Sequence, residues 1–266
     1  MYSTTYHRAS SADEAATLFG KGEEAKYLAG GQTLLPVMRQ RLAAPSDVID
    51  LSKIKDMIGI APTNNGIEIK GATTHYDVAQ SNDVKKAIPG LAYLASVIGD
   101  PAVRYKGTIG GSLANNDPAA DYPAAVLALN ATVKTNKRTI PADEFFKGLF
   151  TTALADGEII TAVSFPVTAK SGYAKFRNPA SRFALTAVFV ARSPGGDVRV
   201  AATGASQNGV MRVSAIESAL KANWSAGALD NVKVSADGML SDIHGTADYR
   251  ANLVKVMAQR AVAAAG

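Results

Sequence analysis

Apolar and polar residues alternate along the first third of the chain in a way that predicts interleaved helices and strands. Apolar positions recur at helical spacing in some segments, and short apolar or alternating runs typical of strands lie between them. An Asn64-Asn65-Gly66 turn between two alternating runs favours a hairpin. We expect a small βαβ-like unit followed by an antiparallel sheet. The predicted helices are 11–21, 34–41 and 74–80, and the predicted strands are 25–28, 48–51, 57–61 and 66–71.

The rest of the chain mixes strands and helices and ends in a helical cluster. Strand patterns dominate between residues 131 and 204, and amphipathic segments follow residue 213. We expect an α+β fold in which the first domain ends near Pro166–Lys170. The predicted helices are 91–98, 124–129, 214–221, 226–232 (weaker) and 249–264, and the predicted strands are 131–135, 159–165, 172–177, 185–192 and 198–204.

The amino-acid composition limits the kinds of chemical site and of binding partner that the chain can have. The chain has 266 residues and no cysteine, which excludes disulfides, thiol nucleophiles and thiolate-ligated clusters or zinc. His7, His75 and His244 lack metal-ligand spacing. The net charge of +5 arises from scattered basic residues, so we expect no nucleic-acid partner. No apolar run is long enough for a membrane span or a signal peptide, and we therefore expect a cytoplasmic protein.

The first candidate site is the glycine turn from Leu28 to Pro36, between a predicted strand and a predicted helix. Gly30 and Gly31 allow the backbone to approach a phosphate, and the N–H groups of a helix start favour an anion. Gln32 and Thr33 add side-chain donors. A turn without a ligand explains this segment equally well, and neither a G-x-G-x-x-G fingerprint nor a P-loop is present.

The second candidate is the run of small and hydrogen-bonding residues from Gly107 to Asp121. Such a run makes a poor core but a good surface for a ribityl chain and a pyrophosphate. Asp117-Pro118 also suits a helix start with Asp117 as the N-cap, which is the role we favour for Asp117. Asp121 would then lie in the first helical turn, where the helix dipole favours a carboxylate. From these residues alone, a structural and a ligand-binding role remain open for Asp121.

Four segments, taken in order, resemble the FAD-binding or medium subunit of molybdenum hydroxylases, the family of aerobic carbon monoxide dehydrogenase, xanthine dehydrogenase and aldehyde oxidoreductase. The resemblance covers nearly the whole chain, and four ordered matches are far more specific than any single one. The segments are Ala29–Pro36, Gly71–His75, Thr108–Asp121 and His244–Arg250.

The resemblance implies a two-subdomain FAD-binding domain of the vanillyl-alcohol-oxidase (PCMH) type. This domain would span residues 1–168, with subdomains of about 1–55 and 56–168. A C-terminal domain of a three-stranded antiparallel sheet and helices would span residues 169–266. The benzoyl-CoA reductase branch carries an extra cysteine-ligated cluster, and the absence of cysteine excludes that branch.

The resemblance also implies non-covalent FAD and a set of contacts. The first loop would bind the pyrophosphate, Gly110–Ser112 would continue that surface, and Asp121 would hydrogen-bond the polar part of the flavin. Thr73 and Thr74 would approach from the second subdomain, with Lys175 and Pro179–Phe183 near the isoalloxazine ring. The predicted cofactor-binding residues are Leu28, Ala29, Gly30, Gly31, Gln32, Thr33, Leu34, Thr73, Thr74, Gly107, Thr108, Ile109, Gly110, Gly111, Ser112, Ala114, Asn115, Asp121, Ile159, Ile160 and Lys175.

The implied role is electron transfer, with no catalytic residue expected in this chain. Molybdenum cofactor would sit in a large partner subunit and [2Fe–2S] clusters in a small one, in a dimer of heterotrimers, and electrons would leave from FAD to an external acceptor. Association with the inner face of the membrane fits this picture without an integral segment. Two alternatives are an independent flavoenzyme, which needs its own substrate pocket and acid or base, and a nucleotide-binding scaffold with a structural flavin.

Overall fold

The computed structural model describes residues 1–265 and begins with a small parallel sheet of strand order β1-β3-β2. The helices α1 and α2 follow β1 and β2, as the apolar spacing predicted, and Ser11 caps α1 by accepting a hydrogen bond from the Glu14 N–H. The strand β1 was missed because its residues are polar and mostly exposed. The elements are β1 (Thr5–Arg8), α1 (Ala12–Phe19), β2 (Lys26–Leu28), α2 (Leu34–Arg39), β3 (Asp47–Asp50) and the 3-10 helix η1 (Lys55–Met57).

A second, antiparallel sheet of strand order β4-β5-β10-β6-β7 forms the middle of the molecule. The predicted hairpin is confirmed, since β4 and β5 pair across Asn64 and Asn65. The strands are β4 (Ile60–Thr63), β5 (Gly66–Lys70), β6 (Thr132–Thr135), β7 (Thr139–Pro141) and β10 (Ile160–Pro166), and a short pair is formed by β8 (Phe146–Gly148) and β9 (Thr151–Thr152).

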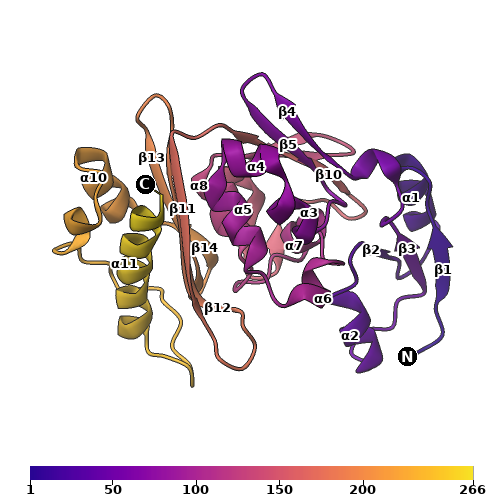
Figure 1. Cartoon of the computed structure of the whole chain (residues 1–266). Coiled ribbons are helices and arrows are strands. Elements are labelled where there is room, and N and C mark those ends of the chain that lie inside the picture. The colour runs from indigo at the N-terminus through magenta and orange to yellow at the C-terminus, as the bar shows by residue number, and fades with distance from the viewer. Residues whose placement is uncertain (266) are drawn as a thin grey trace.

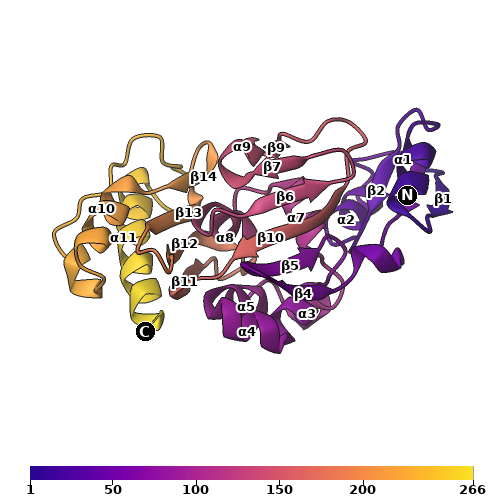
Figure 2. The same ribbon diagram turned by 90° about the horizontal axis from the view of Figure 1, so that it is seen from above.

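Most of the helices that follow β5 lie between this middle sheet and the C-terminal part of the chain, whereas the short helix of residues 101–104 lies beside α2 (Figures 1 and 2). Their apolar side chains and those of both sheets form one buried cluster that includes Ile69, Leu91 and Phe189. The helices are α3 (His75–Gln80), α4 (Asn82–Ala87), α5 (Pro89–Ser96), α6 (Pro101–Arg104), α7 (Ile109–Asn115), α8 (Tyr122–Ala128) and α9 (Ala142–Phe145).

The C-terminal sheet has four strands in the order β11-β12-β13-β14, so the expectation of three strands was wrong by one. The additional strand, β14, has only four residues, too few for an alternation pattern to identify it. The elements are β11 (Lys170–Arg177), β12 (Ala184–Arg192), β13 (Val198–Ser206), β14 (Gly209–Arg212), α10 (Ser214–Ala222), the 3-10 helix η2 (Ala226–Leu229) and α11 (Ala247–Ala264).

This sheet is covered on both faces, which accounts for the unbroken apolar run of β12. Ala187 and Phe189 pack into the cluster of the middle helices, whereas Val188 and Val190 pack under α10 and α11. Figure 1 shows α10 and α11 on the outer face of the sheet. The change of sheet between β10 and β11 falls at the boundary predicted from the sequence, and we keep that domain division as a proposal.

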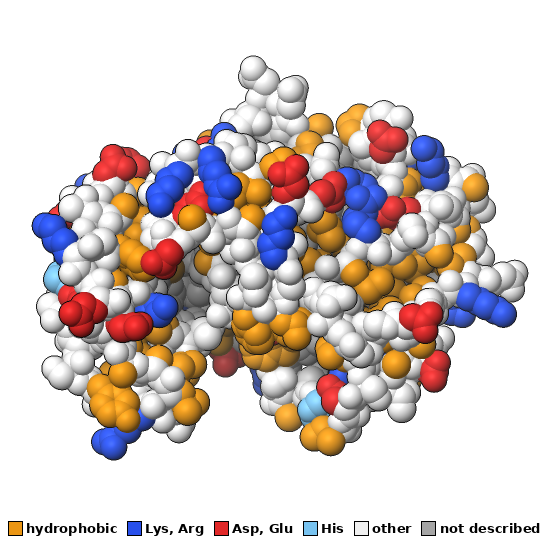
Figure 3. Space-filling model, turned by 180° about the vertical axis from the view of Figure 1, so that it is seen from behind, with side chains coloured by type: hydrophobic (Ala, Val, Ile, Leu, Met, Phe, Trp, Pro, Cys, Tyr) orange, Lys and Arg blue, Asp and Glu red, His pale blue; other side chains and the backbone are white. Residues whose placement is uncertain are grey.

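Charged residues of both signs are mixed on the face seen in Figure 3, where a hollow separates the lobe of β1–β3, on the left, from the rest of the molecule. Within residues 1–265, no helix combines the length and the apolar character that crossing a bilayer requires.

Candidate functional site

The first glycine turn lies where β2 ends, and its glycines are required by packing. A Cβ on Gly30 would overlap the Lys106 carbonyl oxygen, so this glycine lets the turn contact the segment before α7. Gly31 has φ +72°, a conformation that favours glycine. Within residues 1–265 the backbone N–H groups of Gly31 and Gln32 donate no hydrogen bond. These two N–H groups are therefore available to an anion.

The second glycine segment contains a helix, α7, for which the sequence analysis gave no element. Thr108 caps α7 by accepting a hydrogen bond from the Gly111 N–H at 3.1 Å. The N–H groups of Ile109 and Gly110 donate to the carbonyls of Thr73 and Gly71. The first-turn amides of α7 are thus already paired, and this segment presents its α-carbons and the Ser112 hydroxyl instead.

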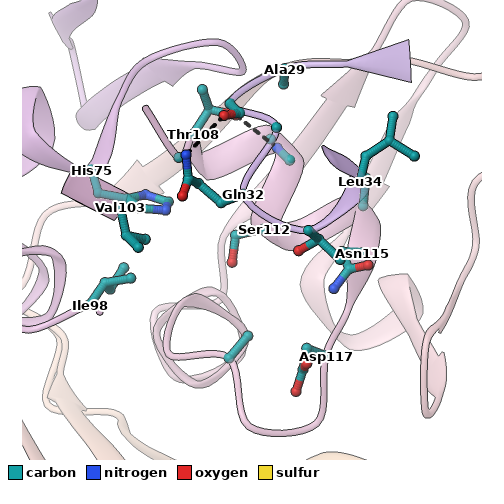
Figure 4. A pocket seen from close by; sticks show the side chains of 18 of the residues that line it. Ala29, Gln32, Leu34, His75, Ile98, Val103, Thr108, Ser112, Asn115 and Asp117 are labelled. Atoms are coloured by element: carbon teal, nitrogen blue, oxygen red, sulfur yellow. Dashed lines mark hydrogen bonds between the residues drawn. The ribbon is translucent and has the colours of Figure 1, made fainter. Parts of the chain in front are cut away.

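A cavity of about 790 Å³ lies between the two glycine segments and extends to the C-terminal sheet. Its volume is within the range of small-molecule and cofactor sites. Figure 4 shows Gln32 and Thr108 close together, with Ser112, Asn115 and Asp117 along one side of it. The predicted residues that line this cavity are Leu28, Ala29, Gly30, Gly31, Gln32, Thr33, Leu34, Gly107, Thr108, Gly110, Gly111, Ser112, Ala114, Asn115, Asp121, Ile159, Ile160 and Lys175.

Three predicted residues lie outside the cavity wall. The Thr73 hydroxyl is buried and bonds both backbone groups of Gly59. Thr74 caps α3 and bonds Asp77. Ile109 is fully buried in the core of the middle helices. All three residues have structural roles, and their predicted cofactor contacts stay predictions.

Other residues of the cavity wall were not among the predicted cofactor-binding residues. Several belong to the α6 region, for which no motif exists, and Phe150 comes from the β8–β9 tip. The segment Pro179–Phe183, which was expected near the isoalloxazine ring, contributes its last three residues. The additional residues are Lys26, Tyr27, Val37, Leu51, Met57, Gly71, Ala72, His75, Ile98, Gly99, Asp100, Val103, Asp117, Ala120, Phe150, Glu158, Ser181, Arg182 and Phe183.

Asp117 is not a helix cap, which corrects our interpretation of Asp117-Pro118. Its carboxylate accepts a hydrogen bond from the Ala119 N–H at 2.8 Å, so it closes a turn. The following helix, α8, begins later at Tyr122, with Asp121 at the N-cap position and Pro123 in its first turn. The sequence contains two Asp and Pro combinations here, and the second one starts the helix.

Asp121 lies at the inner end of the cavity, where it joins α8 to β11. Its carboxylate accepts a hydrogen bond from the Tyr173 hydroxyl at 2.5 Å and pairs with Lys175 Nζ at 2.9 Å. The Asp121 and Lys175 side chains are 4% and 3% exposed. Burial raises the pKa of Asp121, and Lys175 and Tyr173 oppose that shift by stabilising the carboxylate. These bonds account for the absence of a side-chain cap from Asp121 to α8.

A second buried carboxylate of the cavity wall, Glu158, is also paired. It accepts hydrogen bonds from Arg138, from the Thr135 hydroxyl at 2.6 Å and from the Ala155 N–H at 2.8 Å. Together these bonds lower the pKa of Glu158 to about 2. Glu158 therefore stabilises the loop before Ile159 as a permanently ionised group at neutral pH.

The residues of the cavity fit a dinucleotide such as FAD. Free N–H groups at Gly31 and Gln32 suit a pyrophosphate, apolar walls at Ile98, Ile159 and Ile160 suit flat rings, and Asp121 and Lys175 supply polar groups.

Comparisons with known proteins also indicate FAD binding, and the similar proteins match nearly the whole chain. The family described as the FAD binding domain in molybdopterin dehydrogenase matches residues 2–168. The chain is 35% identical to the nicotine 6-hydroxylase medium subunit of Paenarthrobacter nicotinovorans, over 98% of this chain and 96% of that protein. It is 33% identical to the carbon monoxide dehydrogenase medium chain of Afipia carboxidovorans, over 97% and 94%.

The fold agrees equally closely with a solved structure. One chain of the reconstituted CO dehydrogenase from Oligotropha carboxidovorans superposes with a TM-score of 0.89 at 31% identity, and the match covers 99% of this chain and 97% of that chain.

Proposed function

We propose that this chain, which belongs to the family of FAD binding domains in molybdopterin dehydrogenases, is the electron-transfer flavoprotein subunit of a molybdenum hydroxylase complex. It would bind FAD non-covalently and pass electrons from [2Fe–2S] clusters of a partner subunit to an external acceptor. FAD supplies the redox chemistry, and the protein supplies binding, orientation and the electrostatic environment.

The observation that carries this proposal is the single cavity formed by both glycine segments and the C-terminal sheet. The first glycine turn, α7 and β11 are far apart in sequence, yet Gly31, Gly111 and Lys175 line the same space. The medium subunits and chains among the relatives match over nearly their full length, so the resemblance includes β11 as well as the FAD-binding domain.

Within this proposal each group of residues has a defined task. The Gly31 and Gln32 N–H groups would bind the pyrophosphate, and Ser112 would bond the ribityl region. Asp121 and Lys175 would face the polar edge of the flavin. The Asp121–Lys175 pair keeps both charges compensated in a buried position, where an isolated charge would be costly.

The two buried carboxylates of the cavity wall are already paired, which argues against the alternative of an independent flavoenzyme. Asp121 is paired with Lys175, and Glu158 with Arg138, so neither is free to act as the general acid or base of such an enzyme. The other alternative, a scaffold with a purely structural flavin, can be tested by reducing the partner subunits. In such a scaffold the flavin would stay oxidised when the partners are reduced.

We further propose that the partners are an iron–sulfur small subunit and a large subunit with molybdenum cofactor, arranged as a dimer of heterotrimers. Two of the relatives are named as a medium subunit and a medium chain, which implies larger and smaller companions. A cytoplasmic location remains part of this proposal.

Reconstitution with FAD tests the cofactor assignment. The purified chain should take up about one FAD per chain, give an oxidised-flavin absorption spectrum and lose FAD on acid precipitation, as a non-covalent cofactor does. A chain that remains colourless after incubation with excess FAD while staying folded would contradict the proposal. Rapid oxidation of aldehydes or N-heterocycles by the isolated holo-chain would instead support the independent flavoenzyme.

A further inference from the structure

We propose that His75 is a cofactor-positioning residue whose neutral imidazole hydrogen-bonds an uncharged hydroxyl or carbonyl group of bound FAD. This inference rests on the proposed function. His75 lies outside the two glycine segments, at the end of the Gly71–His75 segment that carries part of the family resemblance, and it was not among the predicted cofactor contacts.

The position of His75 is fixed by its backbone and by a glycine. It begins α3, and its N–H donates to the Gly107 carbonyl at 2.9 Å. A Cβ on Gly107 would lie only 2.5 Å from His75 Nε2, so the imidazole uses the space that this glycine leaves. The ring is therefore held directly beside the segment that leads into α7.

The imidazole forms part of the cavity wall. His75 lines the cavity together with Ile98 and Val103, and Figure 4 shows its ring close to Val103. Its two immediate neighbours in the wall are apolar, and the nearby polar residue Asp100 is exposed at the start of α6. An uncharged group of a ligand placed there would find one hydrogen-bonding partner amid apolar surface.

The ring is also incompletely bonded by the protein itself. His75 is 4% exposed; its Nε2 keeps some accessible surface and forms no hydrogen bond within residues 1–265, whereas its unpartnered Nδ1 is completely covered by protein. On its other side the ring packs against Tyr122, with ring centroids 5.3 Å apart. The Nε2 atom, beside Gly107 at the cavity, is therefore the nitrogen that a group of bound FAD would reach.

The charge state of the ring selects the kind of group it can bind. Burial, with a smaller contribution from Arg104, lowers the pKa of His75 to about 4. At neutral pH the ring is uncharged and offers one donor and one acceptor nitrogen. It therefore suits a hydroxyl or carbonyl group, while the anionic pyrophosphate is left to the Gly31 and Gln32 amides.

Titration of purified apoprotein with FAD, followed by quenching of flavin fluorescence, tests the inference. We expect His75→Phe, which keeps a ring but loses both nitrogens, to raise the Kd about tenfold. His75→Gln places an amide near Nε2 and should stay within about threefold of the wild type. His7→Phe is the matched control, because His7 lies on β1 outside the cavity and should leave the Kd unchanged.

The outcomes separate this inference from the proposed function. Failure of the wild type to bind FAD would contradict the proposed function itself. Unchanged affinity in His75→Phe, or equal weakening in His75→Gln and His75→Phe, would overturn the assignment of His75. If His75→Phe does not fold, the ¹⁵N NMR signals of the His75 ring in the wild-type protein test the contact instead. We expect these signals to shift when FAD is added, and unchanged signals would contradict the contact.

Discussion

At the residue scale, single atoms decide which segments can meet around the cavity. Gly30 and Gly107 each occupy a position where a Cβ would collide with a neighbour, so the first turn, His75 and the segment before α7 approach closely only because both residues lack one. Gly111 differs, because its nearest neighbours would be Thr108 Oγ1 at 3.0 Å and Ala29 Cβ at 3.5 Å. It therefore leaves space that faces the first glycine turn and the cavity.

Substitution of Gly111 tests that space. We expect Gly111→Val to stay folded and to retain less than about a tenth of the wild-type FAD, because the branched side chain fills the gap between α7 and Ala29. Flavin per chain is measured by absorbance after reconstitution and gel filtration. Gly20→Val is the control, since Gly20 has open surroundings at the end of α1, far from the cavity. Full FAD occupancy in Gly111→Val would remove α7 from the proposed site.

Predictions for single residues were correct where the residue type has one dominant structural role. The first turn was found because paired glycines between a strand and a helix mark a backbone that passes close to another group. Asp117 was misassigned because an Asp-Pro pair suits both a turn and a helix start, and Pro123 provides the actual start. The hydroxyls of Thr73 and Thr74 bond Gly59 and Asp77, which only tertiary structure reveals, and the cofactor contacts predicted for both residues stay predictions.

At the element scale, the site depends on how β11 meets the start of α8. Tyr173 and Lys175 on β11 both reach Asp121, which links the C-terminal sheet to the helical layer. Long apolar runs predicted most strands and helices, and α11 differs from its predicted start by two residues because Thr246 caps it. The short elements β14, β7 and α6 were missed because three or four residues carry no readable periodicity.

Removal of the cation from this junction should destabilise the protein. In Lys175→Met, Asp121 loses its buried partner, and we expect the free energy of unfolding to fall by about 3 to 5 kcal/mol. Urea denaturation followed by circular dichroism measures the change. The control Lys134→Met breaks the pair with Glu68, whose lysine is 45% exposed, and should cost less than about 1 kcal/mol. Equal effects of the two substitutions would contradict a special role for the buried pair.

At the scale of the whole molecule, two of the three hydrophobic clusters meet at the cavity. Ile159 belongs to the cluster of the N-terminal lobe and Ile160 to that of the middle helices, and both line the cavity. Such a boundary is where a ligand can contact several independently packed parts of a chain. Sequence patterns predicted the parts but not this meeting point, because contacts between distant segments leave no local periodicity.

The stability of the folded protein should fall in two separate pH ranges when the pH is lowered. The folded protein disfavours protonated His75, whose pKa is about 4 instead of 6.5, so stability should fall as the pH drops from about 6.5 to 4. Glu68 and Glu158 have pKa values lowered from 4.5 to about 2, so the stability they contribute is lost between those values. Asp121 acts in the opposite direction, because burial raises its pKa.

Urea midpoints measured from pH 7 to pH 2 check this profile. His75→Gln should reduce the fall in the upper pH range while leaving that in the lower range, and Glu158→Gln should reduce the fall in the lower range. A wild-type midpoint that stays constant from pH 6.5 to 4 would show that His75 is not held neutral by the fold.

The central claim is that this chain works as the flavoprotein subunit of a larger molybdenum enzyme. The most direct measurement is to isolate the tagged protein from its native cells and determine flavin, iron, molybdenum and polypeptide content together. We expect one FAD per chain, one molybdenum and the four iron atoms of two [2Fe–2S] clusters, together with one larger and one smaller polypeptide. A yellow protein that purifies alone, without iron or molybdenum, and oxidises a substrate by itself would contradict it.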